Sequence, residues 1–357
     1  MLCGRVLLLT ETESAGIWID RIRRLVDDAC DQFNELHRMV KDVRLEFKMP
    51  KAWESSFGLA FVDGGSTYVD FTGGSIYFVR AAGAFFKSPD KPIWESEVST
   101  GFTTLSRNVD RFVGIERDIL EIQTAINLLQ YKPDIVVLDN SLASYAGMGI
   151  PHSILHRFKD PRPDNSPEFK YFTRFVTLMK RFDLLIKECL LNDILLVGAA
   201  KDPRSRGYAK KLQLGDSVMD VAAVSLIADG RTGFTPEFES QYIRVDRIEE
   251  YFKKKGILVE GRGDIVASFC ILAPRANPFK VDYLKLQRDR MDEIQRRIVS
   301  LHDGSGYLLP SHIVHDHAAI PTILAEGLEY LVLKRTAERD MKTARTILGA
   351  QRRSRFG

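Results

Sequence analysis

Apolar residues recur along this chain in two different periods, and these periods mark the helices and strands that we expect. The helical period predicts helices over 17–39, 111–129, 169–191 and 214–227, and, near the end, 285–302, 311–325 and 327–347. Short apolar runs typical of strands cover 57–63, 134–139, 193–200, 241–245, 264–272 and 279–283. Strands and helices follow one another through most of the chain, so the pattern predicts an α/β fold.

The first predicted strand, 57–63, ends in Asp63 and is followed at once by Gly-Gly-Ser-Thr67. We expect the chain to turn on these glycines. The segments 66–71 and 75–80 then flank Thr-Gly-Gly74, which is typical of a hairpin. Together these runs predict three antiparallel strands in succession, before the helix at 111–129.

The remaining stretches lack a clear period. Residues 84–108 and 143–168 are rich in Pro, Gly, Ser or charge, and we expect both to be loops. The last residues, 351–357, form a basic tail. We expect an N-terminal helical extension over 1–50, a main domain over 51–325, and a C-terminal helix with the tail over 326–357.

The composition excludes several classes of protein. Of 357 residues, 45% are hydrophobic and 28% are charged, which is ordinary for a globular protein. No apolar run approaches the ~20 residues of a membrane span, and the N-terminus is a poor signal peptide. The four cysteines form no CxxC pair, so neither zinc nor a disulfide framework is indicated. We expect an intracellular, cytoplasmic protein.

Charge gives little direct information about a partner, because 51 Lys and Arg nearly balance 48 Asp and Glu. The basic residues are grouped locally, as around Arg204 and Arg206. Local groups of this kind suit a nucleic-acid groove.

Acidic residues stand at the ends of two predicted strands, with an acidic helix between them. Asp63 ends the first strand and Asp139 ends the strand at 134–139, and the helix between offers Glu116, Asp118 and Glu121. Strand, helix and strand, each carrying an acid, is the order of the RNase H-like fold, in which the acids meet. Three carboxylates from separate elements bind hard divalent cations through oxygen, and a pair of such ions can cleave a phosphodiester.

Further candidate residues lie later in the chain. Lys201 follows a buried strand, where it could hold a phosphate or simply extend into solvent. His312, His315 and His317 cluster after Tyr307. They could be a solvated helix face, or they could supply acid–base and phosphate contacts.

Five motifs in order resemble the NurA nucleases. They are Val62-Asp63-Gly-Gly-Ser66, Arg117-Asp-Ile-Leu-Glu121, Ile135-Val-Val-Leu-Asp139-Asn-Ser-Leu142, Val197-Gly-Ala-Ala-Lys201-Asp-Pro-Arg-Ser205 and Gly306-Tyr307-Leu-Leu-Pro-Ser-His-Ile-Val-His315. The resemblance extends over about 57–320. Two positions depart from the family pattern: Asn140 stands in place of a glycine, and Leu308 in place of a proline.

The resemblance implies a metal-dependent deoxyribonuclease with an RNase H-like mixed sheet. It selects Glu121 as the third acid, so that Asp63, Glu121 and Asp139 would bind Mn²⁺, or Mg²⁺, as two ions. Lys201, Tyr307 and His315 would complete the catalytic site, and Arg204 and Arg206 would contact DNA.

The resemblance also implies biological context. The family digests single- and double-stranded DNA from 5′ to 3′, cuts single strands internally, and works with the hexameric translocase HerA in DNA end resection. It would make this chain a homodimer, associated with the nucleoid.

Two other functions fit parts of the same pattern. A sugar-kinase- or actin-type ATPase could use Asp63-Gly-Gly-Ser-Thr67 as a phosphate loop, although the only candidate for its second loop, Ala228-Asp-Gly-Arg-Thr-Gly233, is poor. Alternatively, a scaffold without nuclease activity could clamp DNA, although the acids and Lys201 are intact.

Overall fold

The computed structural model describes residues 11–71, 73–87, 91–105, 107–146, 150–201, 205–240, 246–258, 261, 263–340 and 342. These residues form two compact units. One unit contains the long helix α1 (Glu11–Val40) with α6 (Gly207–Lys211) and α7 (Asp220–Ala228). The other contains the sheet and the remaining elements. Among the helices that the structure describes, none is long and apolar enough to cross a membrane.

The sheet unit begins with three long antiparallel strands, β1 (Leu59–Phe71), β2 (Gly74–Phe86) and β3 (Ile93–Thr103). Helix α2 (Val109–Leu128) and the 3₁₀ turn η1 (Leu129–Tyr131) lead to the short buried strand β4 (Ile135–Leu138). After β4 come α3 (Leu142–Ala146), α4 (His152–Leu155), η2 (His156–Phe158) and the long helix α5 (Pro167–Leu191). Strand β5 (Leu195–Ala200) then returns to the sheet.

The second half of the unit extends the sheet. It contains β6 (Gly233–Phe234), β7 (Phe238–Glu239), α8 (Asp246–Lys254), β8 (Ile265–Ile271) and β9 (Phe279–Leu284). The 3₁₀ segment η3 (Lys285–Arg290) and the helices α9 (Met291–Ser300), α10 (Leu309–Ala318) and α11 (Thr322–Arg339) follow.

The strand order confirms the expected fold class. Within the described residues, the strands form one nine-stranded sheet in the order β3-β2-β1-β4-β5-β9-β8-β6, with β7 paired to β8. β4 runs parallel to β1 and β5 runs parallel to β4, whereas β9 is antiparallel to β5. The mixed sheet, with β1–β3 antiparallel and β4 and β5 parallel, is RNase H-like. The chain also has a long helix near each end, α1 and α11 (Thr322–Arg339).

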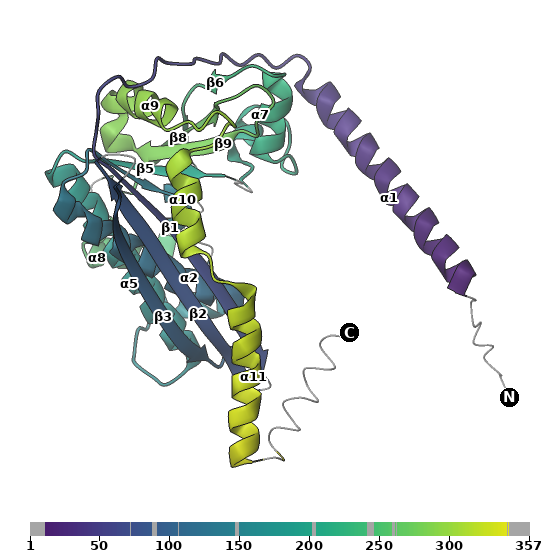
Figure 1. The fold of residues 1–357 in the computed structure, drawn as a ribbon, viewed down its shortest axis with the longest axis vertical. Helices are drawn as coiled ribbons and strands as arrows, with labels where there is room; N and C mark the ends of the chain where they lie inside the picture. The colour runs from purple at the N-terminus through teal and green to yellow at the C-terminus, as the bar shows by residue number, and fades with distance from the viewer. Residues whose placement is uncertain are drawn as a thin grey trace. The chain divides into compact units, whose positions relative to one another are not determined.

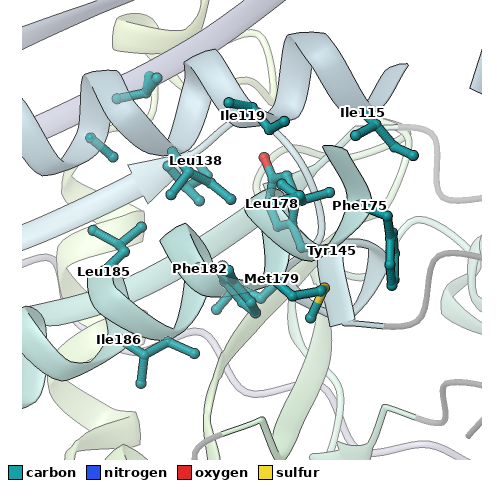
Figure 2. Packing of buried hydrophobic residues seen from close by; sticks show 14 of the residues in the cluster. Ile115, Ile119, Leu138, Tyr145, Phe175, Leu178, Met179, Phe182, Leu185 and Ile186 are labelled. Carbon is teal, nitrogen blue, oxygen red and sulfur yellow. The ribbon is translucent and has the colours of Figure 1, made fainter. Parts of the chain in front are cut away.

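Alternate residues of β1 point to opposite faces of the sheet, as in any strand. Ala60 and Val62 belong to the core beneath α2 and α5, whereas Leu59 and Phe61 belong to the core beneath α9 and α10. Figure 1 shows α10 and α11 over one face of the long strands and α2 and α5 behind the other. By this alternation Asp63 faces α10. The α2–α5 core contains Ile115 and other large side chains that interlock between the two helices (Figure 2).

Several expected elements differ from those observed. The chain does not turn after Asp63, because β1 continues as one strand to Phe71. The third antiparallel strand is therefore β3, which lies within the region 84–108 that was expected to be a loop. The region 143–168 contains α3 and α4 rather than only loop. The helices expected at 311–325 and 327–347 are α10 and α11, which divide at Pro321. The strand expected at 241–245 lies outside the described residues.

Candidate functional site

Two aspartates meet where β1 and β4 lie side by side. The strands are parallel and in register, with Val62 opposite Leu138. The backbone N–H of Asp139 donates to the carbonyl of Val62 at 2.8 Å, which extends the pairing by one residue. Asp63, within β1, and Asp139, directly after β4, therefore stand as neighbours, and both side chains are almost buried.

Helix α10 brings a histidine and a serine to these aspartates. Nδ1 of His315 lies 2.7 Å from Oδ2 of Asp63. One turn earlier on the helix, the hydroxyl of Ser311 donates to Oδ2 of Asp139 at 3.3 Å. Asp63, Asp139 and His315 each offer a ligand atom, and these atoms lie within 4.8 Å of one another. This trio is the candidate metal centre.

Strand β5 adds a cation to the same place. The ammonium of Lys201 lies 2.6 Å from Oδ2 of Asp139 and 4.8 Å from the centre of the Tyr307 ring. Asp139, Lys201, Tyr307 and Ser311 also line one small cavity. The structure thus brings together five of the six expected catalytic residues: both aspartates, Lys201, Tyr307 and His315.

Glu121, the sixth, approaches from the other face of the sheet. A Cβ added to Gly64 would lie 2.3 Å from Oε1 of Glu121, so the glutamate packs directly on the backbone beside Asp63. Its Oε1 is 3.1 Å from Nε of Arg117, and its Oε2 accepts a hydrogen bond from the Tyr145 hydroxyl at 2.5 Å. Glu121 is outside the trio of close ligand atoms, but it adjoins Asp63.

The other acids of α2 have structural partners. Glu116 forms two hydrogen bonds to Arg174 of α5, at 2.7 and 2.6 Å. Asp118 accepts two hydrogen bonds from Arg117. Of the three acids that the pattern left open, Glu121 is therefore the one beside the aspartates.

The other two histidines of the cluster contact different groups. His312 lies 3.2 Å from the Asp303 carboxylate, and its ring is 4.6 Å from that of Tyr307. His317 stacks on Trp94 with the ring centres 3.9 Å apart. Neither belongs to the trio of close ligand atoms.

The sequence itself identifies the family of this chain. The family model of the NurA domain matches residues 57–320, about three quarters of the chain. The chain belongs to the NurA family. The matched region contains the six residues that are expected to be catalytic in this NurA chain: Asp63, Glu121, Asp139, Lys201, Tyr307 and His315. A search of curated proteins found no match.

Solved NurA structures share the fold. The NurA nuclease from Sulfolobus solfataricus has a TM-score of 0.65 at 14% identity, and the match covers 93% of this chain and 98% of that one. A second NurA structure has a TM-score of 0.60 at 12% identity, covering 91% and 99%. A third, NurA with manganese, has a TM-score of 0.54 at 13% identity, covering 88% and 97%. These likenesses show the fold, and by its family this chain is a nuclease.

Burial determines the electrostatics of the NurA site. Burial, and then the neighbouring Asp63 carboxylate, raise the pKa of Asp139 to about 7, although Lys201 acts to lower it. Burial also raises the pKa of Glu121 to about 8, against the opposing charge of Arg117. Buried carboxyl groups with raised pKa values hold their charges at a cost unless a cation neutralises them.

The site fits a divalent metal on independent grounds. Oδ1 of Asp139 is buried and has no hydrogen-bond partner among the described residues. Buried polar atoms are rarely left unpaired, so this oxygen is available to a cation. The two carboxylates of the trio supply the oxygen ligands that manganese and magnesium prefer.

Two arginines, Arg204 and Arg206, were expected to contact DNA. Arg204 lies outside the described residues. Arg206 precedes α6, where one of its Nη1 hydrogens points to the carbonyl of Asp216 at 3.4 Å. Contact of either arginine with DNA stays a prediction.

Sequence reasoning missed the supporting residues. Ser311 and Tyr145 are buried and donate to Asp139 and Glu121, and no pattern signalled either of them. The two glycines after Asp63 were noticed for the wrong reason. Neither has a positive φ, and they are instead needed for space, since a Cβ on Gly65 would lie 2.3 Å from the carbonyl oxygen of Ala318.

Proposed function

We propose that this chain is a metal-dependent deoxyribonuclease, in which Asp63, Glu121 and Asp139 hold manganese or magnesium, as two ions. The observation that carries the proposal is the convergence of Asp63, Asp139 and His315 within 4.8 Å, in a NurA-family chain. The solved NurA with manganese, which has the same fold, supports the choice of ion.

The bound ions would supply a water of lowered pKa and stabilise the leaving oxygen of the phosphodiester. The chain's own residues do the rest. Strand pairing fixes the backbone of Asp63 and Asp139, and His315 and Ser311 contact one oxygen of each carboxylate, which favours a single placement of the ligands. Glu121 adds a third negative charge from the opposite face.

The cations of the site would bind the substrate. The Lys201 side chain is about a quarter exposed and lies on Asp139, so its ammonium can reach a phosphate oxygen beside the ions. The imidazole of His315 is 60% exposed and held by Asp63, so it can accept or donate a proton at a substrate oxygen. Tyr307 orients Lys201 through its ring.

We further propose that the enzyme digests DNA ends from 5′ to 3′, cuts single strands internally, and acts in end resection as a homodimer with a HerA-type hexameric translocase. These points rest on family membership. Arg204 and Arg206 would contact the DNA backbone, which makes binding sensitive to salt.

The decisive experiment is digestion of DNA with and without manganese. Duplex and single-stranded substrates labelled at either end distinguish the polarity of digestion, and a closed single-stranded circle reports internal cutting. We expect manganese-dependent cleavage that Asp63→Ala abolishes while the circular dichroism spectrum is kept. Cleavage by Asp63→Ala at the wild-type rate would refute the proposal.

The phosphate-loop alternative is not favoured by the geometry. A phosphate loop presents successive backbone N–H groups from a turn. Here Gly64, Gly65 and Thr67 are paired within β1, opposite residues of β2. The segment is thus an extended strand, in which the N–H of Gly64 donates to the Asp63 carboxylate at 2.7 Å, rather than a turn that forms an anion cradle.

A further inference from the structure

The short segment from Asn140 to Tyr145 connects the two halves of the site. It begins directly after Asp139, which faces α10, and it ends on α3 at Tyr145, which lies in the core beneath α2. The hydroxyl of Tyr145 donates to Oε2 of Glu121 at 2.5 Å. The six residues from Asn140 to Tyr145, together with this hydrogen bond, therefore connect Asp139 to Glu121, although the two acids approach the site from opposite faces of the sheet.

Tyr145 is held in one position by its surroundings. Its side chain is fully buried, and its ring lies 5.4 Å from that of Phe182. Figure 2 shows Tyr145 between α5 and α2, with its oxygen directed toward the helix that carries Ile119. The hydroxyl is the donor in its hydrogen bond to Glu121.

The start of the segment is anchored to strand β9. The hydroxyl of Ser141 donates to Oδ2 of Asp282, and the N–H of Ala143 donates to the same oxygen at 3.2 Å. The ammonium of Lys280, itself buried, lies 3.5 Å from this oxygen and 3.3 Å from the Ser141 hydroxyl. A Cβ on Gly198 would lie 2.5 Å from the carbonyl oxygen of Asn140, so the segment also packs closely on β5.

We propose that Tyr145 is a positioning residue for the metal site, which fixes the Glu121 carboxylate in the orientation that binds the ion. The proposal rests on the proposed function and deepens it. Tyr145 donates to Oε2 of Glu121, and the Arg117 guanidinium forms an ion pair with Oε1 at 3.1 Å. Each oxygen keeps a second lone pair, and the carboxylate plane is fixed.

Without the Tyr145 hydroxyl, the orientation of the Glu121 carboxylate is no longer fixed. Arg117 alone would hold one oxygen, and because it also binds Asp118 it constrains Glu121 weakly. The carboxylate could then rotate about its terminal torsion, which has a broad energy profile. Residues that orient metal ligands typically contribute about 10- to 100-fold in metal affinity.

The test is Tyr145→Phe in the full chain, which removes one oxygen and keeps the ring. Manganese affinity is measured by calorimetry and by the electron paramagnetic resonance signal of free Mn²⁺. We expect the dissociation constant to rise about 10-fold or more. Cleavage should fall at limiting manganese and recover as manganese is raised, which a purely structural defect would not do.

Tyr283→Phe is the matched control. Tyr283 is also fully buried, and its hydroxyl donates to a carboxylate, that of Glu237, at 3.0 Å. Glu237 is not one of the site's acids. This control loses the same kind of hydrogen bond, and we expect its manganese affinity to stay within about twofold of wild type.

The outcomes separate the two proposals. If the wild type binds no manganese and cuts no DNA, the proposed function fails. If the wild type binds manganese and Tyr145→Phe binds it equally well, only the positioning role fails. Should Tyr145→Phe not fold, Phe182→Leu decides, because Phe182 packs on the Tyr145 ring and its loss lets that ring shift while the hydroxyl is kept. We expect it to weaken manganese binding about threefold, and an unchanged affinity would overturn the role.

Discussion

Replacement of Gly64 by alanine tests whether Glu121 acts in the site. Gly64 lies between Asp63 and Gly65 in a continuous strand, so alanine adopts its backbone without strain. The added methyl group would lie 2.3 Å from Oε1 of Glu121, 2.6 Å from its Cγ and 2.8 Å from its Cδ. The carboxylate must therefore move.

The size of the effect follows from these distances. Ordinary van der Waals contact begins near 3.4 Å, so Oε1 has to shift by about 1 Å. A shift of ~1 Å in a catalytic group costs about 100-fold in rate, which is about 2.7 kcal/mol of transition-state stabilisation. Overpacking of a core position costs about 1–3 kcal/mol of stability. We expect Gly64→Ala to remain folded and to lose most of its activity.

The assay combines kcat/KM for cleavage of a labelled single strand with urea denaturation. Gly114→Ala is the control, since a Cβ there meets nothing within 4 Å. It lies in the same helix as Glu121, and alanine should stabilise that helix by about 0.5–1 kcal/mol without loss of activity. A folded Gly64→Ala with wild-type kcat/KM would show that the position of Glu121 is unimportant.

Three further changes test other parts of the site. Lys201→Met should lower kcat about 100-fold or more with little change in the unfolding midpoint, because it removes a charge aimed at the phosphate; single-turnover kinetics with a normal rate would contradict this. Ser311→Ala should raise the manganese concentration needed for half-maximal cleavage about 10-fold, since Asp139 loses its hydroxyl donor; an unchanged manganese dependence would assign Ser311 to packing alone. In the metal-free protein, the pKa values of Asp139 and Glu121 are raised to about 7 and about 8. The folded state therefore keeps protons that the unfolded chain loses near pH 4. The free energy of unfolding should fall as pH rises from about 4 to about 8. Urea denaturation in chelator measures this slope, and Glu121→Gln should flatten it.

Part of the site could be predicted because Asp63, Asp139 and Lys201 each follow a buried apolar run. Asp139 and Lys201 come directly after the parallel strands β4 and β5, and Asp63 lies within β1 beside the end of β4, so strand pairing brings the three together. His315 was found through its motif rather than through periodicity. The acids of α2 could not be separated by pattern, because Glu116 and Glu121 are both buried and differ only in their partners.

The errors have physical reasons. Strand β3 was missed because it is an edge strand, where polar residues such as Ser96 and Thr100 are tolerated on an exposed surface. The glycines after Asp63 were interpreted through their backbone freedom, whereas their lack of a side chain is what matters. Tyr145 and Ser311 resemble ordinary core and helix residues in sequence, and only the three-dimensional partners distinguish them.

The contact between His315 and Asp63 spans 252 positions of the sequence. During synthesis the aspartate therefore emerges from the ribosome long before its partner on α10. The nascent chain therefore lacks His315 and Ser311 beside its aspartates until nearly the whole sheet unit has been made. If His315 acts as proposed, a fragment truncated before α10 is expected to be inactive.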